Sequence, residues 1–381
     1  MNTCVSPILE TVCDFIVDCL HNTAPLEDAG YPSIRTPNVG KGRLLLDGVN
    51  RVSEETYQLW TRRASPEAGD LILAREAPAG NVAIIKEGER VCLGQRTVHI
   101  RPNKRIVDPD FLCYLLLAPA QQGKLLSAET GATAKHVNML DIRRLPLTYF
   151  PSLQTQQALG FVLAQYDGLI ENNRRRMTLL EESARLLYQE WFVRLRFPGY
   201  EQTRIVDGVP KGWDQLPLED ALILQRGFDL PTHARQEGTV PIYGSTGILG
   251  FHNTSRANGP GIVTGRSGTL GEVQFVAEDY WPLNTALWVK EFKRIDPYYA
   301  LFLLREMDLK QYNGGASVPT LDRKSVHRVA ILIPPASFRQ SFSDFARCVF
   351  DQIKNLDTQN KKLRTARDLL LPRLMSGEIS V

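Results

Sequence analysis

The sequence predicts a mixed α/β (α+β) protein in which two similar globular domains are separated by a long antiparallel two-helix coiled coil, with a pseudo-two-fold internal repeat. Three observations lead to this prediction: two heptad stripes of apolar residues, an internal repeat at an offset of about 184 residues, and short segments rich in β-branched and aromatic residues in each copy.

The two apolar stripes lie in the middle and at the end of the chain, and each is spaced alternately by four and three residues, as in a coiled-coil seam. Each stripe carries one asparagine, Asn173 or Asn360, and a buried residue of this kind sets register rather than adding stability. The alternative is that each helix packs only on its neighbouring domain. The residues expected to pair the helices are Leu159, Ile170, Asn173, Leu180, Leu187, Trp191, Val349, Ile353, Asn360, Leu363, Leu370 and Leu374.

The internal repeat extends beyond the helices into the globular parts. Gly131–Pro151 aligns with Gly315–Pro335, and Asp108–Leu116 ("DPDFLCYLL") aligns with Asp296–Leu304 ("DPYYALFLL"). Further upstream, Arg75 aligns with Arg266, within strand-like segments such as "GDLILAR" and "GIVTGR". We therefore expect a first domain over residues 1–150, a central helix over 151–195, a linker over 196–212, a second domain over 213–335 and a C-terminal helix over 336–381.

Composition restricts the function without naming it. The 381 residues are 43% hydrophobic and 23% charged, with 45 basic and 42 acidic side chains, so a polycationic DNA binder is not indicated. The sequence shows neither a signal peptide nor a membrane span, so we expect a cytoplasmic protein. The six cysteines include no CxxC spacing, which favours free buried thiols over a metal site.

The order of segments and several motifs give the chain a likeness to a known family. "RDLLLPRLMSGEI" at the end, "ARLLYQEWF" on the central helix, "RTPNVGKGRL" and "LGQRTVHIRPN" in the first domain, and "VPIYGSTGILGF" and "WPLNTALW" in the second resemble the specificity subunit of type I restriction-modification systems. The likeness covers essentially the whole chain. One departure is the start, where "SPILETVCDFIVD" lacks the tryptophan of "VPKGWDQLPLED".

The resemblance implies a function for each part. Each globular domain would be a target recognition domain that reads one half of a bipartite double-stranded DNA target, and the helices would dock methyltransferase subunits, two in number. Restriction subunits would join through the assembled complex. The chain itself would be non-catalytic and need no cofactor, with S-adenosylmethionine bound by the methyltransferase. The helices, at about 50 to 60 Å, are long enough to hold two readers more than one turn of DNA apart.

Enzymatic alternatives find little support in the residues. The Asn/Asp-Pro-Pro-Phe/Tyr tetrad of an adenine methyltransferase is absent, and "GRSGTLG" (Gly265–Gly271) lacks the GxGxxG spacing, so a tight turn is favoured. Asp279, Glu291 and Lys293 form at best a weak nuclease-like pattern. A coiled-coil scaffold that does not read DNA is the main non-enzymatic alternative.

Candidate DNA contacts are polar residues in turn-like segments, because arginine, asparagine and glutamine read base edges while lysine, arginine and serine hold phosphates. Arg75 and Arg266 are equivalent in the repeat, which indicates a shared role in phosphate binding or in strand-turn structure. The run Arg174–Arg176 is interpreted as a solvated face or as a contact for phosphates or an acidic partner. The candidates are Arg35, Lys41, Arg43, Arg75, Gln95, Arg96, Lys135 and His136 in the first domain, and Tyr243, Ser245, Asn253, Arg256, Arg266, Asn284, Ser317 and Arg323 in the second.

Overall fold

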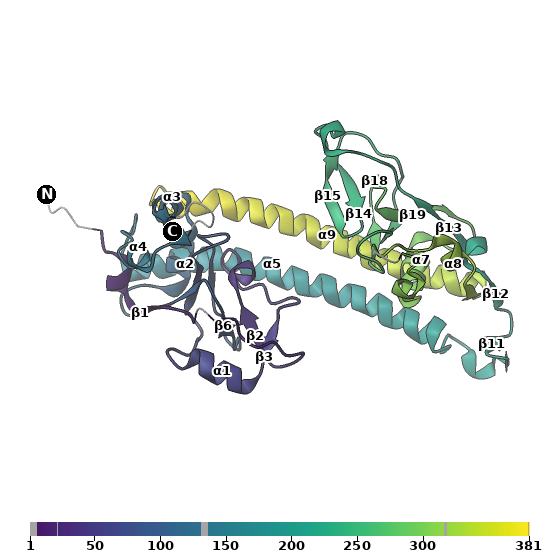
Figure 1. Cartoon of the computed structure of the whole chain (residues 1–381), viewed down its shortest axis with the longest axis horizontal. Coiled ribbons are helices and arrows are strands. Elements are labelled where there is room, and N and C mark those ends of the chain that lie inside the picture. The colour runs from purple at the N-terminus through teal and green to yellow at the C-terminus, as the bar shows by residue number, and fades with distance from the viewer. Residues whose placement is uncertain (1–5, 21, 131–135, 316–317, 380) are drawn as a thin grey trace. The chain divides into compact units, whose positions relative to one another are not determined.

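The computed structural model describes residues 6–20, 22–130, 136–315, 318–379 and 381. It divides into two compact units, residues 1–174 with 357–381 and residues 175–356. Each unit contains one globular domain and part of each of two long helices, α5 (Leu153–Tyr188) and α9 (Ala336–Met375) (Figure 1).

The first domain is built on a four-stranded antiparallel sheet in the order β1-β7-β4-β5. The strands are β1 (Cys13–Asp18), β7 (Thr97–Pro102), β4 (Leu71–Ala74) and β5 (Val82–Ile84). Leu71 and Leu73 pack into one apolar cluster and Ile72 and Ala74 into another. Alternate side chains of a strand point to opposite faces, so both faces of this sheet are covered, which explains the unbroken apolar run "LILA".

Helices and a smaller sheet cover the two faces. On one face lies α2 (Pro109–Leu117), which begins at Asp108, whose carboxylate accepts a hydrogen bond from the Phe111 amide. Such a cap contributes about 1 kcal/mol. The other cluster includes Ile34 of β2 (Tyr31–Ile34) and Leu93 of β6 (Cys92–Leu93), which form a small sheet together with β3 (Arg51–Val52). The remaining elements are α1 (Glu54–Thr61), α3 (Pro119–Ser127), α4 (Met139–Arg143), β8 (Glu129–Thr130) and β9 (His136–Val137).

The second domain repeats the strand order of the two sheets β1-β7-β4-β5 and β3-β2-β6. Its main sheet has the order β13-β19-β16-β17, with β13 (Leu222–Arg226), β19 (Ala286–Phe292), β16 (Gly261–Gly265) and β17 (Val273–Val276). The helix α7 (Pro297–Glu306) begins at Asp296, the counterpart of Asp108, with the same carboxylate cap. The other strands and helices are β12 (Asp214–Pro217), α6 (Leu218–Ala221), β14 (Val240–Gly244), β15 (Gly247–His252), β18 (Trp281–Pro282), α8 (Arg323–His327) and β20 (Ala330–Ile333). The predicted internal repeat is thus present in the fold.

The long helices run antiparallel. In the first unit Asn173 of α5 bonds Asn360 of α9, and Asp167, nearly two turns earlier, pairs with Arg367, nearly two turns later. In the second unit the Tyr188 ring packs against Phe342, with ring centroids 5.5 Å apart. Partner numbers rise on one helix as they fall on the other, which defines the antiparallel arrangement.

The predicted seam packs both against the other long helix and against the domain cores. Around Asn173 and Asn360 the helices bury each other, but towards the ends the seam residues join the domain cores. Leu159 and Leu374 belong to the core of the first domain, and Val349 to that of the second. Helix pairing and packing on the neighbouring domain, weighed as alternatives from the sequence, therefore both occur along the same stripe.

The central helix changes character before its predicted end. The α-helix stops at Tyr188 and continues as one π-helical turn, Gln189–Val193. At the end of the α-helix the buried side chain is Tyr188, while the predicted Leu187 is half-buried. In the π-helical turn Phe192 is buried, while Trp191, also predicted on the seam, is half-buried.

Beyond the helix, the segment expected as a linker contains a small hairpin, β10 (Ile205–Val206) with β11 (Val209–Pro210). It is anchored by Phe197, which packs on Trp213 and Phe338.

The structure also tests the predictions on the cysteines and on membrane spans. The described cysteines Cys13, Cys19, Cys92, Cys113 and Cys348 are free thiols. The prediction of buried thiols holds for Cys19, Cys92 and Cys113 but is wrong for Cys348, which is exposed on α9, and for Cys13, which is half-buried; Cys4 lies outside the described residues. In the part of the chain that the structure describes, no helix has the length and apolar content needed to cross a membrane.

Candidate nucleic-acid interface

Each domain has one edge at which the same backbone contacts recur. In the first domain the Arg75 amide donates to the Arg96 carbonyl at 3.1 Å, and the Val137 amide donates to the Arg75 carbonyl at 3.0 Å. In the second, the Arg266 amide donates to the Thr285 carbonyl at 2.9 Å, and the Leu321 amide donates to the Arg266 carbonyl at 2.8 Å. Because β4 and β7 are antiparallel, the end of one meets the start of the other, and these loops converge.

We call these loops the first edge and the second edge. The first edge comprises residues 35–36, 75–77, 95–96 and His136; Thr36 joins it through a hydrogen bond from its hydroxyl to the Ala77 carbonyl. The second edge comprises residues 243–245, 266–267, 284–285 and Thr320, where Ser267 and Thr320 are bridged and the Leu283 amide bonds the Tyr243 carbonyl. Lys135 and Ser317, predicted beside these loops, lie outside the described residues.

The candidate side chains of the first edge differ in how they are held. Arg75 forms an ion pair with Asp18 at 2.8 Å, and its side chain is only 16% exposed. Arg96 pairs with Glu76 at 3.2 Å but remains half exposed, and Arg35 is exposed. The Gln95 amide contacts the Thr23 hydroxyl at 3.4 Å. Arg75 is thus committed to the interior of the domain, while Arg35 and Arg96 reach solvent.

The second edge shows the same division. The Arg266 guanidinium donates to the Asn284 carbonyl at 3.1 Å, so the equivalent arginines both serve strand-turn structure within their domains. The Asn284 side chain bonds Asp229. Burial, together with the nearby Glu278 carboxylate, raises the pKa of Tyr243, so its hydroxyl stays protonated and can donate a hydrogen bond. Ser245 is half-buried beside it.

Three predicted residues of the second domain project from other loops. Asn253 is exposed and bonds Gln236, Arg256 is exposed over the rings of Phe228 and Trp281, and Arg323 is exposed at the start of α8. A guanidinium over aromatic faces is held in place while its donors stay available.

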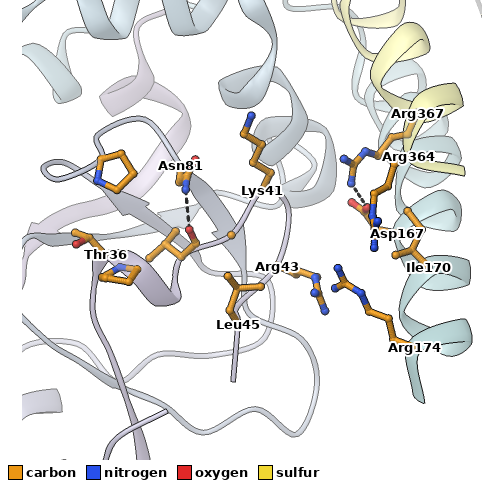
Figure 2. Close-up of a pocket in the computed structure, with 14 residues that line it drawn as sticks. Thr36, Lys41, Arg43, Leu45, Asn81, Asp167, Ile170, Arg174, Arg364 and Arg367 are labelled. Atoms are coloured by element: carbon orange, nitrogen blue, oxygen red, sulfur yellow. Dashed lines mark hydrogen bonds and ion pairs between the residues drawn. The ribbon is translucent and has the colours of Figure 1, made fainter. Parts of the chain in front are cut away.

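Lys41 and Arg43 belong to a separate feature, a cavity of about 340 Å³ between a loop of the first domain and the two helices. Its lining includes Arg174 of α5 and Arg364 and Arg367 of α9, so five cationic side chains surround it. Figure 2 shows Arg43 and Arg174 directed towards each other across this space, with Arg364 and Arg367 above them. We call this feature the basic pocket.

The two helix arginines of α9 were missed by sequence reasoning as site residues. Their spacing, three residues apart on one helix face, was the available signal.

Two residues of the weak nuclease-like pattern have structural partners. The Lys293 ammonium donates to the Glu219 carbonyl, and the Asp279 carboxylate accepts from the Gly259 amide. Residues 266–272 form the turn between β16 and β17, as predicted, with Gly268 and Gly271 at positive φ.

The repeated edges are matched by a repeated family model. The model described as "Type I restriction modification DNA specificity domain" matches residues 24–182 and again residues 210–363. The chain belongs to this family. It is a type I restriction-modification specificity subunit with two target recognition domains.

Individual relatives agree with this assignment. The chain is 26% identical over 364 residues to the type I restriction enzyme MjaIX specificity subunit of Methanocaldococcus jannaschii, with 88% of this chain and 83% of the relative covered. It is 20% identical to the HindI specificity subunit of Haemophilus influenzae, with 92% and 95% covered. The fold is similar to the crystal structure of a type I S subunit from M. genitalium, with a TM-score of 0.59, 15% identity and coverage of 98% and 97%.

Proposed function

We propose that each domain of this specificity subunit reads one half of a bipartite double-stranded DNA target through its edge. The observation that carries this proposal is the pair of equivalent edges, built on the same backbone contacts in two copies of the specificity domain. On the first edge, Arg35 and Arg96 are the base-reading or phosphate-holding candidates; on the second, Tyr243, Ser245 and Asn284 are. Arginine, asparagine and serine are side chains suited to base edges and phosphates.

The helices would dock two methyltransferase subunits, and restriction subunits would join through them. Both helices carry exposed large apolar side chains, which a docked subunit would cover. They are Phe161, Leu169, Leu179 and Leu186 on α5 and Phe345 and Leu369 on α9. The chain would be non-catalytic and would act with S-adenosylmethionine bound by the methyltransferase. Because the proposed ligand is double-stranded DNA, we propose a cytoplasmic location.

A domain exchange tests the proposal. Residues 199–334 would be replaced by the equivalent segment of a related specificity subunit, and the methylated sequence of host DNA would be mapped by methylation profiling. One half of the target should change while the other stays the same. If both halves changed together, the edges would not be independent readers.

A second test concerns the helices. Inserting one heptad into each, after Thr178 and after Lys354, preserves the seam and lengthens each helix by about 10 Å, close to three base pairs. We expect the half-sites to persist and the unread gap to lengthen. A change of base identity with an unchanged gap would contradict the proposed spacing role.

A further inference from the structure

The basic pocket carries more positive charge than its own ion pairs neutralise. Arg43 pairs with Glu171, Arg174 lies 3.7 Å from the same carboxylate, and Arg367 pairs with Asp167 and Asp368. Among the described residues, Lys41 and Arg364 have no hydrogen-bond or ion-pair partner, although both line the cavity. Five cations and three paired carboxylates leave a surplus at this place in an otherwise balanced chain.

The pocket is held open by a rigid frame. Asp167 accepts hydrogen bonds from the Tyr114 hydroxyl at 2.7 Å and from Arg367, so it ties α2, α5 and α9 together. Burial and the Asp167 carboxylate raise the pKa of Tyr114 far above its usual range, so the hydroxyl remains a donor. Burial alone would lower the pKa of Arg367, but attraction to Asp167 and Asp368 raises it. Opposite, the Asn81 amide fixes the Val39 carbonyl at 3.0 Å and with it the loop that carries Lys41.

The pocket adjoins the first edge. Thr36 and Pro78 line it, and their neighbours Arg35 and Ala77 belong to the edge; the Thr36 hydroxyl bonds the Ala77 carbonyl between them. Exposed cations therefore continue from Arg96 and Arg35 to Lys41, and the half-buried Arg364 faces Lys41 across the cavity. A duplex engaged by the first edge would carry its backbone over this opening.

We propose that the basic pocket binds one or two phosphate groups of the DNA backbone just outside the half-site read by the first domain, in the unread gap. Guanidinium groups match phosphate oxygens with paired hydrogen bonds, and such contacts position a protein on DNA without reading its sequence. This proposal rests on the proposed DNA reading. It adds a contact to the DNA backbone that does not depend on the base sequence. Lys41 and Arg364 supply the unpaired charge, and the frame around Asp167 holds them on opposite walls.

The test uses the complete complex with its methyltransferase subunits and a duplex carrying its methylation target. The double variant Lys41→Ala, Arg364→Ala is compared with Lys124→Ala, Lys362→Ala, which removes the same charge from exposed positions on α3 and α9 outside the pocket and the edges. Binding is measured by fluorescence anisotropy over a series of salt concentrations. We expect about tenfold weaker binding for the pocket variant and a decrease of about one to two in the slope of log K against log salt. The methylated sequence should be unchanged.

A second arm identifies the source of the phosphate. Neutral methylphosphonate linkages placed in the gap next to the first half-site should weaken wild-type binding about as much as the double variant does, and should not weaken the variant further. If the pocket variant matched the control variant on the unmodified duplex, the assignment would be overturned while DNA reading stood. The assignment would also be overturned if inorganic phosphate bound the pocket but the methylphosphonate duplex bound wild type normally. It would be overturned as well if the pocket variant lost its methyltransferase subunits. If wild type itself failed to prefer a bipartite target, the proposed function would fail first.

Discussion

The paired asparagines at the centre of the helices allow a sharp test of what the seam does. The Asn173 amide donates to the Asn360 side-chain oxygen at 3.0 Å, and the Asn360 amide donates to the Ile170 carbonyl at 3.3 Å. Both residues are buried, at 7% and 1% exposure. Replacing Asn360 by leucine removes both bonds and leaves the Asn173 amide with only a 3.5 Å contact to Gln359.

The magnitudes follow from these contacts. A buried polar group left without a partner costs about 1–3 kcal/mol, whereas replacing both partners by apolar groups of similar shape is neutral or stabilising. The Ile170 carbonyl keeps its bond within the helix, so it adds little. We expect Asn360→Leu to lose about 1–2 kcal/mol of unfolding free energy, the double variant Asn173→Leu, Asn360→Leu to equal or exceed wild type, and a coupling energy of about 2 kcal/mol.

Urea unfolding of the intact chain, followed by circular dichroism and by hydrogen exchange of the buried amides of β4 and β7, measures the effect on the unit that contains the pair. Asn172→Leu and Asn355→Leu are matched controls, because they make the same change at exposed positions of the same helices. A single variant as stable as wild type, or a double variant less stable than either single one, would refute the idea of a polar contact that sets register.

Three further outcomes are expected. Leu370→Asp with Leu374→Asp should destabilise the first unit by several kcal/mol, and with it methyltransferase association, because both leucines pack into the core of that unit. Leu369→Asp, at a side chain that is 66% exposed, should leave the unfolding free energy unchanged; urea unfolding measures both variants. Burial would raise the pKa of Asp70, but hydrogen bonds from Arg101, His99 and the Glu67 amide lower it from 3.8 to about 2, so Asp70 stabilises the fold by about 2 kcal/mol above pH 4 and loses this as pH falls through 2. The stability difference between wild type and Asp70→Asn should therefore be full at pH 7 and narrow between pH 4 and pH 2; a constant difference would contradict the ion-pair assignment. Arg96→Ala should weaken DNA binding with little loss of stability, whereas Arg75→Ala should lower stability through loss of the Asp18 pair, and thermal unfolding beside anisotropy separates the two.

The sequence predicted the features that depend on periodicity, namely the two long helices and the internal repeat. It did not predict the contacts between segments that are far apart in the chain. The heptad stripes located both long helices, and the aligned pairs Arg75 with Arg266 and Val137 with Leu321 occupy equivalent hydrogen bonds. Heptad spacing shows which face of a helix is apolar, but it does not say what covers that face. Near the ends of the helices it is a domain core, and the π-helical turn at Gln189–Val193 could not be read from spacing because it interrupts the pattern.

The basic pocket could not be predicted from the sequence, because it is formed by segments that are far apart in the chain. It joins Lys41 and Arg43 to Arg174 and to Arg364 and Arg367, which are far apart in the chain. In the sequence Arg174 belongs to a run of three arginines, and neither Arg364 nor Arg367 is predicted as a site residue. Only the antiparallel register, set by contacts such as Asn173 with Asn360, brings them to one place.

The equivalence of the two edges also distinguishes residues that hold the loops in place from residues that can contact base pairs. The backbone contacts place Arg75 with Arg266, Arg96 with Thr285, and Gln95 with Asn284. The Gly94 amide bonds the Ile34 carbonyl as the Leu283 amide bonds the Tyr243 carbonyl, so Arg35 falls on Gly244. Arg75 and Arg266, whose side chains are held inside their domains, are the same residue in both copies. The positions of Arg35 and Arg96, which reach solvent on the first edge, carry different residues on the second edge. Two readers of different half-sites need this arrangement: one shared backbone that presents the loops, and unlike side chains where the base pairs differ.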